Sequence, residues 1–158
     1  MRQAGRGIIV NVAGIGAFRG SPNAGLYCAS KAALTTLTEA LQHETDPHGI
    51  RVCLLQLGHF RTSFLQPSHR VKVAGHIPDY DPVLDPLRAA FNGLNGAQPG
   101  DPVKAATVIV ELLKKSDPRD IPFLLALGSD VPAAELSTHK ARREEMLKTE
   151  SITSSTDF

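Results

Sequence analysis

Cysteine is scarce in this sequence. Only Cys28 and Cys53 occur among 158 residues, and neither belongs to a Cys-x-x-Cys or Cys/His spacing. Two cysteines placed in this way form neither the disulfide framework of a small secreted domain nor a zinc site. The sequence therefore predicts no metal and a reducing, cytoplasmic setting.

An excess of charge and a long apolar run are also lacking. Lys and Arg number 17 against 16 Asp and Glu, which gives a formal net charge of +1. No electrostatic excess therefore attracts nucleic acid or an anionic membrane surface. The apolar stretch near the N-terminus ends at Ala13, far short of the roughly 18 residues that a membrane span requires. We expect a small molecule or another protein as the partner, with no nucleic acid and no membrane.

A strand-helix-strand pattern occupies the first part of the chain. The length of 158 residues and the 42% hydrophobic content fit one globular domain. The β-branched run at 8–12 predicts a strand buried on both faces. A glycine-containing loop at 14–25 follows, and apolar spacing predicts a helix over 26–44. A second buried strand is predicted over 49–58, so that a parallel crossover joins the two strands.

The later part of the chain continues the alternation of helices and strands. Asp101 and Pro102 match an N-cap and a first helical residue, which predicts a helix that ends near Lys115. A third strand is predicted over 121–128 and a charged surface helix over 132–150. The fold class is therefore expected to be α/β with a parallel sheet.

Residues 66–100 lack sustained periodicity and are rich in Pro, Gly and His. This composition predicts a long loop without helices or strands. A loop of this length in a compact domain is usually a lid, a binding segment or a disordered stretch.

The glycines after the first strand raise the question of a phosphate-binding turn. Gly14, Gly16 and Gly20 resemble the glycine-rich turn of a dinucleotide site. That motif requires a helix that starts at the second glycine and an acidic residue about 20 positions later. Ser21 and Pro22 disfavour such a helix. A flexible loop and a catalytic arm remain the alternatives.

Tyr27 and Lys31 lie one turn apart on the predicted helix. A phenol with an ordinary pKa near 10 is a poor base at neutral pH, but a cation one turn away favours the phenolate and brings the group into a working range. Lys31 is therefore expected to lower the pKa of Tyr27. The pair alone is weak evidence, since the same spacing is common on solvated helix faces.

Three segments in this order resemble the C-terminal half of the short-chain dehydrogenase/reductase family: "GIIVNVAG", "YCASKAAL" and "GIRVCLLQLGHFRT". The resemblance implies a partial Rossmann-like, doubly wound parallel sheet with the last three strands of the family fold and their flanking helices. It also implies one truncated domain over 1–158. Its parts are a catalytic strand-helix-strand unit at 8–62, a substrate-loop region at 66–100 and a helix-strand-helix unit at 101–150.

The resemblance assigns roles to individual residues. Tyr27 becomes the proton donor, and Lys31 lowers its pKa and holds the nicotinamide ribose, while Gly58, Phe60 and Thr62 line the nicotinamide side. The implied cofactor is NADP or NAD, and the implied reaction interconverts an alcohol and a ketone. The helix that carries Tyr27 is a candidate homo-oligomer contact.

Gly14 departs from the family pattern, which has a serine thirteen residues before the tyrosine. That hydroxyl polarises the substrate carbonyl, and loss of one such donor costs roughly 100- to 1000-fold in rate. Ser21, Asn23 or a water are the alternative donors. A serine introduced at position 14 is expected to raise the rate, provided that the backbone there does not need positive φ. Leu57, where the family has proline, is a smaller change.

The phosphate-binding half of the family fold would precede Met1. A sheet with only the last three strands leaves the strand at 8–12 with an open edge, so the chain is expected to be marginally stable or to associate. The alternative to an active oxidoreductase is therefore a catalytically impaired remnant, or an incomplete gene product, that acts as a protein-interaction module.

Overall fold

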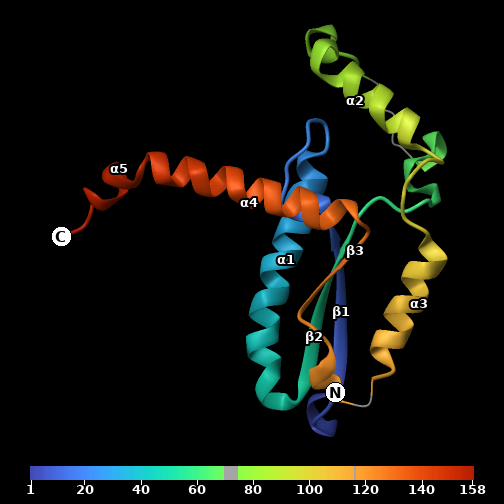
Figure 1. Ribbon diagram of the computed structural model, residues 1–158, viewed down its shortest axis with the longest axis vertical. Helices are drawn as coiled ribbons and strands as arrows, with labels where there is room; N and C mark the ends of the chain where they lie inside the picture. The colour runs from blue at the N-terminus through green and yellow to red at the C-terminus, as the bar shows by residue number, and fades with distance from the viewer. Residues whose placement is uncertain (70–74, 116) are drawn as a thin grey trace.

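Three parallel strands form the centre of the computed structural model (Figure 1), which describes residues 1–69, 75–115 and 117–158. The strands are β1 (Gly7–Gly14), β2 (Ile50–Leu57) and β3 (Leu124–Leu127), in the order β1-β2-β3. Their pairing is parallel throughout, with Val10 opposite Cys53 and Leu54 opposite Leu124. The predicted α/β class and parallel sheet are confirmed.

Helices lie on both faces of this sheet. Helix α1 (Gly25–Thr45) connects β1 to β2, and helix α3 (Pro102–Leu113) precedes β3 on the opposite side (Figure 1). A hydrogen bond of 2.9 Å from the Asn11 side-chain amide of β1 to the Thr38 hydroxyl joins α1 to the sheet. The α3 face holds the hydrophobic core of Cys53, Leu55 and Ile121, against which Ile109 and Leu112 of α3 pack.

The central strand is buried on both faces, and the first strand is not. Val52, Cys53, Leu54 and Leu55 of β2 are each at most 2% exposed, which confirms the prediction for 49–58. The same prediction for 8–12 is wrong, because Ile8 to Asn11 are only partly buried and Val12 is 43% exposed. The physical reason is that β1 has one neighbouring strand in the described part of the chain, so its side chains lack packing partners on the open side.

The predicted helix start at Asp101 is confirmed in detail. The Asp101 carboxylate accepts hydrogen bonds from the backbone N–H groups of Val103 (2.8 Å) and Lys104 (3.2 Å), and Pro102 lies in the first turn, where its missing N–H costs nothing. The helix ends at Leu113 instead of continuing to Lys115. The third strand, predicted over 121–128, is shorter because it begins only at Leu124, after Pro122.

The prediction of a loop without helices or strands over 66–100 is wrong, although its residues 70–74 lie outside the described part of the chain. Helix α2 (Asp81–Leu94) occupies much of the segment. Pro82 lies in its first turn, where proline is tolerated, and the helix also accommodates Pro86. Its partly buried apolar residues recur at helical spacing: Leu84, Leu87, Phe91 and Leu94.

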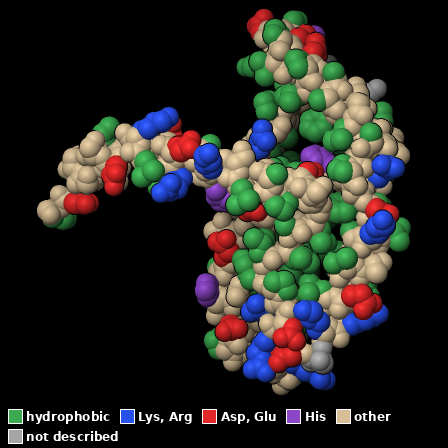
Figure 2. All heavy atoms as spheres, in the orientation of Figure 1, with side chains coloured by type: hydrophobic (Ala, Val, Ile, Leu, Met, Phe, Trp, Pro, Cys, Tyr) green, Lys and Arg blue, Asp and Glu red, His purple; other side chains and the backbone are tan. Residues whose placement is uncertain are grey.

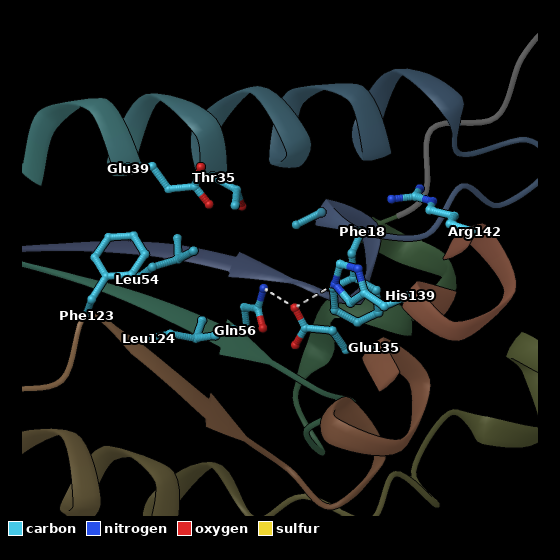
Figure 3. A pocket seen from close by; sticks show the side chains of 11 residues that line it. Phe18, Thr35, Glu39, Leu54, Gln56, Phe123, Leu124, Glu135, His139 and Arg142 are labelled. Atoms are coloured by element: carbon cyan, nitrogen blue, oxygen red, sulfur yellow. Dashed lines mark hydrogen bonds and ion pairs between the residues drawn. The ribbon is translucent and has the colours of Figure 1, made fainter. Parts of the chain in front are cut away.

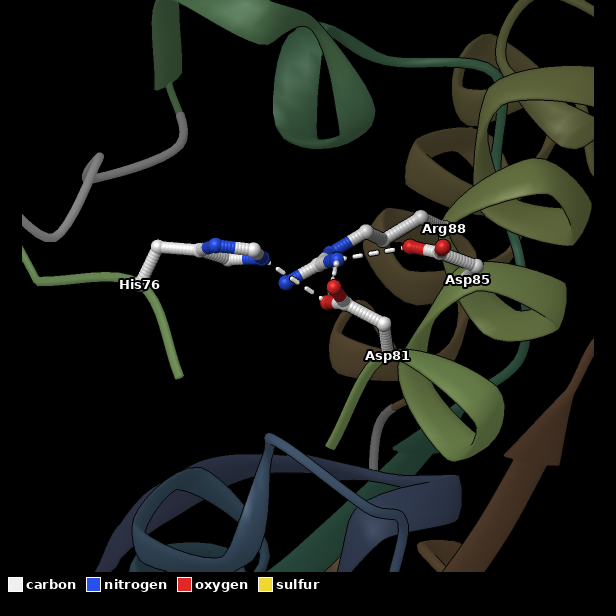
Figure 4. Close-up of polar contacts among 4 residues, drawn as sticks. All are labelled: His76, Asp81, Asp85 and Arg88. Carbon is white, nitrogen blue, oxygen red and sulfur yellow. Dashed lines mark hydrogen bonds and ion pairs between the residues drawn. The ribbon is translucent and has the colours of Figure 1, made fainter. Parts of the chain in front are cut away.

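A group of charged side chains connects the start of α2 to the preceding segment (Figure 4). The Asp81 carboxylate contacts His76 Nε2 at 2.9 Å and an Arg88 guanidinium nitrogen at 3.2 Å, and the same nitrogen lies 2.7 Å from the Asp85 carboxylate. The hydrogen bond from His76 is the main cause that lowers the pKa of Asp81, and the contact with Arg88 lowers it further against the opposing effect of desolvation. The group lies on the charged side of α2 and leaves the apolar side for other contacts.

The C-terminal helices project from the sheet. Helix α4 (Asp130–Lys148) begins two residues before the predicted helix, and a short helix α5 (Glu150–Ser154) follows it. Figure 1 shows the first turns of α4 against the body and its distal part, with α5, extending away. Among the described residues, no helix is long and apolar enough to cross a membrane.

Candidate active site

Tyr27 and Lys31 lie at the carboxyl end of β1, where α1 begins. The Tyr27 side chain is in the first turn of α1, and Tyr27 is 43% exposed. The Lys31 ammonium lies 5.9 Å from the centre of the Tyr27 ring and donates a hydrogen bond of 3.0 Å to the backbone carbonyl of Val12. The predicted one-turn spacing therefore brings both side chains to the same edge of the sheet.

Two neighbours hold the Tyr27 ring in place. A Cβ added to Gly16 would lie 3.1 Å from ring atom Cε1, so the absence of a side chain there allows close contact with the 3-10 turn η2 (Ile15–Ala17). On the other side, the Phe64 ring lies 6.1 Å away between centroids, at an interplanar angle of 47°. Such tilted aromatic pairs are favourable beyond the area that they bury.

Burial raises the pKa of the Tyr27 phenol above its ordinary value of 10.0, and the neighbouring Cys28 raises it further. The prediction that Lys31 lowers this pKa is therefore not met in the chain. The physical reason is that the Lys31 ammonium is bound to the Val12 carbonyl, while the phenol loses solvation at its own end. The phenol therefore stays protonated at neutral pH, and proton donation requires a group that stabilises the phenolate left behind.

Gly14 does not need positive φ, but it has no room for a side chain. Its backbone is extended, with φ −178°, and it pairs with Leu57 in the sheet. A Cβ at this position would lie 2.9 Å from the Leu57 carbonyl oxygen. A serine at position 14 can therefore restore the missing donor only if the ends of β1 and β2 first separate.

Ser21 and Asn23 are the alternative donors on the loop. Among the described residues, neither forms a hydrogen bond with Tyr27. Ser21 is partly buried, and its carbonyl accepts the backbone N–H of Ala24 at 3.1 Å. Asn23 is exposed and has a left-handed backbone, φ 61°, which asparagine tolerates better than most residues. Their proposed role as substitutes for the serine stays a prediction.

The turn after β2 lies at the same edge of the sheet as Tyr27. The Gly58 N–H donates to the Leu127 carbonyl at 2.8 Å, and Phe60 forms an isolated parallel bridge with Gly100. The Thr62 hydroxyl accepts the backbone N–H of Phe64 at 3.3 Å and caps the 3-10 turn η4 (Ser63–Leu65).

Phe64 in turn contacts Tyr27, so η4 joins the predicted nicotinamide side of the site to the predicted proton donor. The structure thus brings the sequence-predicted residues together at one edge. Their catalytic and cofactor-binding roles stay predictions.

The pairing of His59 with Asp130 was not predicted. The Asp130 carboxylate oxygen Oδ2 accepts the backbone N–H of His59 at 2.9 Å and lies 2.7 Å from His59 Nδ1. The other oxygen, Oδ1, is buried and has no hydrogen-bond partner among the described residues. It lies against Gly58, where any side chain would collide with it.

Burial tends to raise the pKa of Asp130, but the hydrogen bonds from the His59 backbone and ring outweigh this effect and lower it below its ordinary value. Asp130 thereby ties the start of α4 to the turn after β2. The sequence offered one signal, the position of His59 in that turn, but nothing in it identified Asp130 as the partner, 71 residues away.

A parallel sheet with helices on both faces, and with a tyrosine and a lysine one turn apart at the carboxyl ends of its strands, defines an α/β protein of the Rossmann-like type. A model of the short chain dehydrogenase family matches residues 1–72. The 3-ketodihydrosphingosine reductase of Bacteroides thetaiotaomicron is 35% identical over 130 residues, which are 81% of this chain and 46% of the reductase. The chain belongs to the short-chain dehydrogenase family.

Solved structures agree with this assignment. A short-chain dehydrogenase from Streptomyces avermitilis superposes with a TM-score of 0.79 at 32% identity, over 100% of this chain and 55% of that one. A putative NAD(P)-dependent gluconate 5-dehydrogenase from Beutenbergia cavernae, with bound NADP at low occupancy, has a TM-score of 0.53 at 26% identity and covers 80% of this chain and 46% of its own. The chain therefore spans about half the length of these relatives.

Proposed function

We propose that this chain carries the catalytic part of an NAD(P)-dependent oxidoreductase that interconverts an alcohol and a ketone. The observation that carries the proposal is that Tyr27, Lys31 and the turn at 58–62 lie at the same carboxyl edge of a parallel sheet, with Phe64 after that turn in contact with the Tyr27 ring. Ligands of open α/β folds bind at this edge. The names of a reductase and of an NADP-bound dehydrogenase among the relatives support the proposal.

The residues present fit one end of a nicotinamide cofactor. Lys31 and the turn at 58–62 offer an ammonium group, backbone groups and the Thr62 hydroxyl around Tyr27. The pyrophosphate end has no comparable site, because the glycines at 14 and 16 are followed only by the short 3-10 turn η2, and α1 starts at Gly25. We infer that this chain binds the nicotinamide end.

Each side chain then has a defined task. The nicotinamide, when bound, supplies or accepts the hydride. Tyr27, which is protonated at neutral pH, donates its proton to the carbonyl oxygen during reduction. Lys31 binds the ribose and stabilises the phenolate that remains after proton transfer. Phe64 shields one side of the Tyr27 ring from water.

Helix α2 contributes to the substrate side in this proposal. It contacts η4, which carries Phe64, and no residue of α2 is fully buried. Figure 2 shows hydrophobic side chains along α2 and in the recess between α2 and the body of the molecule. An apolar helix face next to the Tyr27–Phe64 pair favours a substrate with an apolar portion.

The choice between NAD and NADP depends on residues that hold the adenosine end.

The test uses the two tyrosines of the chain as a matched pair. Oxidation of NADPH and of NADH is followed with a panel of aliphatic and aromatic ketones, for the unmodified chain and for Tyr27→Phe and Tyr80→Phe. Tyr27→Phe removes the proton donor and should abolish turnover, with little change in cofactor affinity. Tyr80, which is 60% exposed on the segment before α2, should be replaceable without loss. Turnover that survives Tyr27→Phe contradicts the assignment.

A second candidate function is supported by the exposed face of α1. Leu26 is 92% exposed and Leu37 is 63% exposed, although both lie on the helix that packs on the sheet. Exposed leucines on one helix are typical of a protein contact. We propose that α1 also serves as a contact between copies of this chain.

A further inference from the structure

A cavity of about 200 Å³ lies between α1, β2 and α4, next to η2 (Figure 3). It is on the α1 face of the sheet, where Leu54 and Gln56 of β2 project. Glu39 enters from α1, and Glu135 enters from α4. None of the five predicted site residues lines it.

Gln56 forms the floor of this cavity and is only 2% exposed. Its amide nitrogen donates to the Glu135 carboxylate at 3.3 Å. Because a carboxylate only accepts hydrogen bonds, this contact fixes which end of the amide is nitrogen. The amide oxygen Oε1 is left buried with no hydrogen-bond partner among the described residues. A buried acceptor of this kind normally has a partner, so the cavity floor lacks a donor.

Glu135 has no permanently charged partner among the described residues. Its side chain is 19% exposed, and its basic neighbour is His139, with Nε2 at 3.6 Å from Oε1, which pairs with it only when the imidazole is protonated. In the described ranges, neither Glu135 nor Glu39 forms an ion pair with a lysine or an arginine. A carboxylate that is largely removed from water is costly unless a positive group compensates it. Arg142 also lines the cavity, but it is exposed and is not paired with Glu135.

The remaining walls are apolar except for Thr35, whose hydroxyl donates to the Lys31 carbonyl at 3.1 Å. Phe18 is 6% exposed and Leu54 is 1% exposed, and Phe123 and Leu124 complete this side. We propose that the cavity binds a small primary amine that carries an apolar group. The ammonium group donates to Glu135 and, after a small rotation about the soft terminal torsion of Gln56, to Gln56 Oε1. The apolar group lies against Phe18 and Phe123.

The first experiment compares three probes that share a phenyl-ethyl body and differ in charge. Phenethylamine, phenethyl alcohol and hydrocinnamate are titrated into the ¹⁵N-labelled chain and followed by NMR and calorimetry. We expect saturable binding of the amine, with shifts on β2 and α4, at least about tenfold tighter than the alcohol. Equal binding of all three, or no binding, overturns the proposal. Tighter binding of hydrocinnamate also overturns it and assigns the charge preference to Arg142.

Two carboxylate variants assign the charge. Glu39→Gln and Glu135→Gln should each weaken phenethylamine binding, with the larger loss, about tenfold or more, for Glu135. Glu144→Gln changes the same charge on an exposed part of α4 outside the cavity and should leave binding unchanged. Because Glu39 is exposed, Glu39→Gln remains informative even where Glu135→Gln lowers stability. Unchanged binding in both cavity variants contradicts the assignment.

Gln56→Leu separates a binding role from a structural role. It removes the unpartnered oxygen and adds an apolar side chain to a buried position. We therefore expect a higher melting temperature together with loss of phenethylamine binding. A structural role through the Glu135 hydrogen bond predicts the reverse, a lower melting temperature. Retained binding in a folded Gln56→Leu variant contradicts the proposal.

Discussion

At the scale of single residues, burial and the neighbouring Cys28 both raise the pKa of Tyr27. Lys31 is one turn away, but its ammonium group is directed at the Val12 carbonyl. The spacing of the two residues was predictable from sequence because one helical turn is a local relation. The direction of the pKa shift was not predictable, because it depends on how η2 and η4 enclose the ring.

The pKa of Tyr27 can be measured directly because the chain has only two tyrosines. In Tyr80→Phe, an ultraviolet titration reports Tyr27 alone, and we expect its pKa above the ordinary value of 10.0. A raised pKa means that the folded state holds the phenolic proton more tightly than the unfolded state. Folding stability is therefore unaffected below about pH 10 and falls as the pH rises above it. A pKa below the ordinary value would show that Lys31 dominates.

Gly14 provides a second test at this scale. Both Gly14→Ala and Gly14→Ser add a Cβ that lies 2.9 Å from the Leu57 carbonyl oxygen. We expect each to lower the free energy of unfolding by about 1–3 kcal/mol, the usual cost of overpacking. Chemical denaturation measures this, and Gly20→Ala, where the added Cβ meets nothing within 4 Å, is the control. A serine variant of unchanged stability would show that the two strand ends separate easily.

At the scale of elements, local signals and long-range contacts differ in what sequence can predict. The helix over 26–44 and the strand over 49–58 match α1 and β2 closely, because apolar periodicity and flanking Gly and Pro are local features. Helix α2 was missed because Pro82, Pro86 and Gly93 obscure its periodicity. The Gln56–Glu135 hydrogen bond joins residues 79 apart in sequence and depends on the packing of α4.

Asp130 connects two elements, and its removal should separate them. Asp130→Ala loses the hydrogen bonds to the His59 backbone and ring, and we expect a cost of about 1.5–3 kcal/mol in folding stability. Because folding lowers the pKa of Asp130, its contribution is present above the ordinary value of 3.8 and is lost as the pH falls through the lowered value. The difference in stability between Asp130→Ala and the unmodified chain should therefore shrink in acid.

Denaturant unfolding at neutral and at acid pH measures this difference. Asp157→Ala, at an exposed position near the C-terminus, is the matched control and should stay within about 0.5 kcal/mol. A loss that is the same at both pH values would mean that the Asp130 carboxylate is not the stabilising group.

At the scale of the whole molecule, two surfaces remain available for association. In the part of the chain that the structure describes, β1 pairs only with β2, so its other edge presents unpaired backbone groups. Helix α1 presents Leu26 and Leu37 to solvent. Both features favour self-association, which would bury apolar surface that the chain leaves exposed.

A pair of charge substitutions distinguishes these surfaces. We expect the chain to sediment as an oligomer that dissociates on dilution, and Leu37→Lys to shift it toward the monomer, because burying an unpaired ammonium in an apolar contact is costly. Leu136→Lys adds the same charge on α4, where Leu136 is 71% exposed, and should change nothing. An oligomer that persists in Leu37→Lys at the same concentration would mean that the open edge of β1 mediates association and that the assignment to α1 is wrong. A monomer at all concentrations would exclude both surfaces, and the exposed leucines would then need another partner.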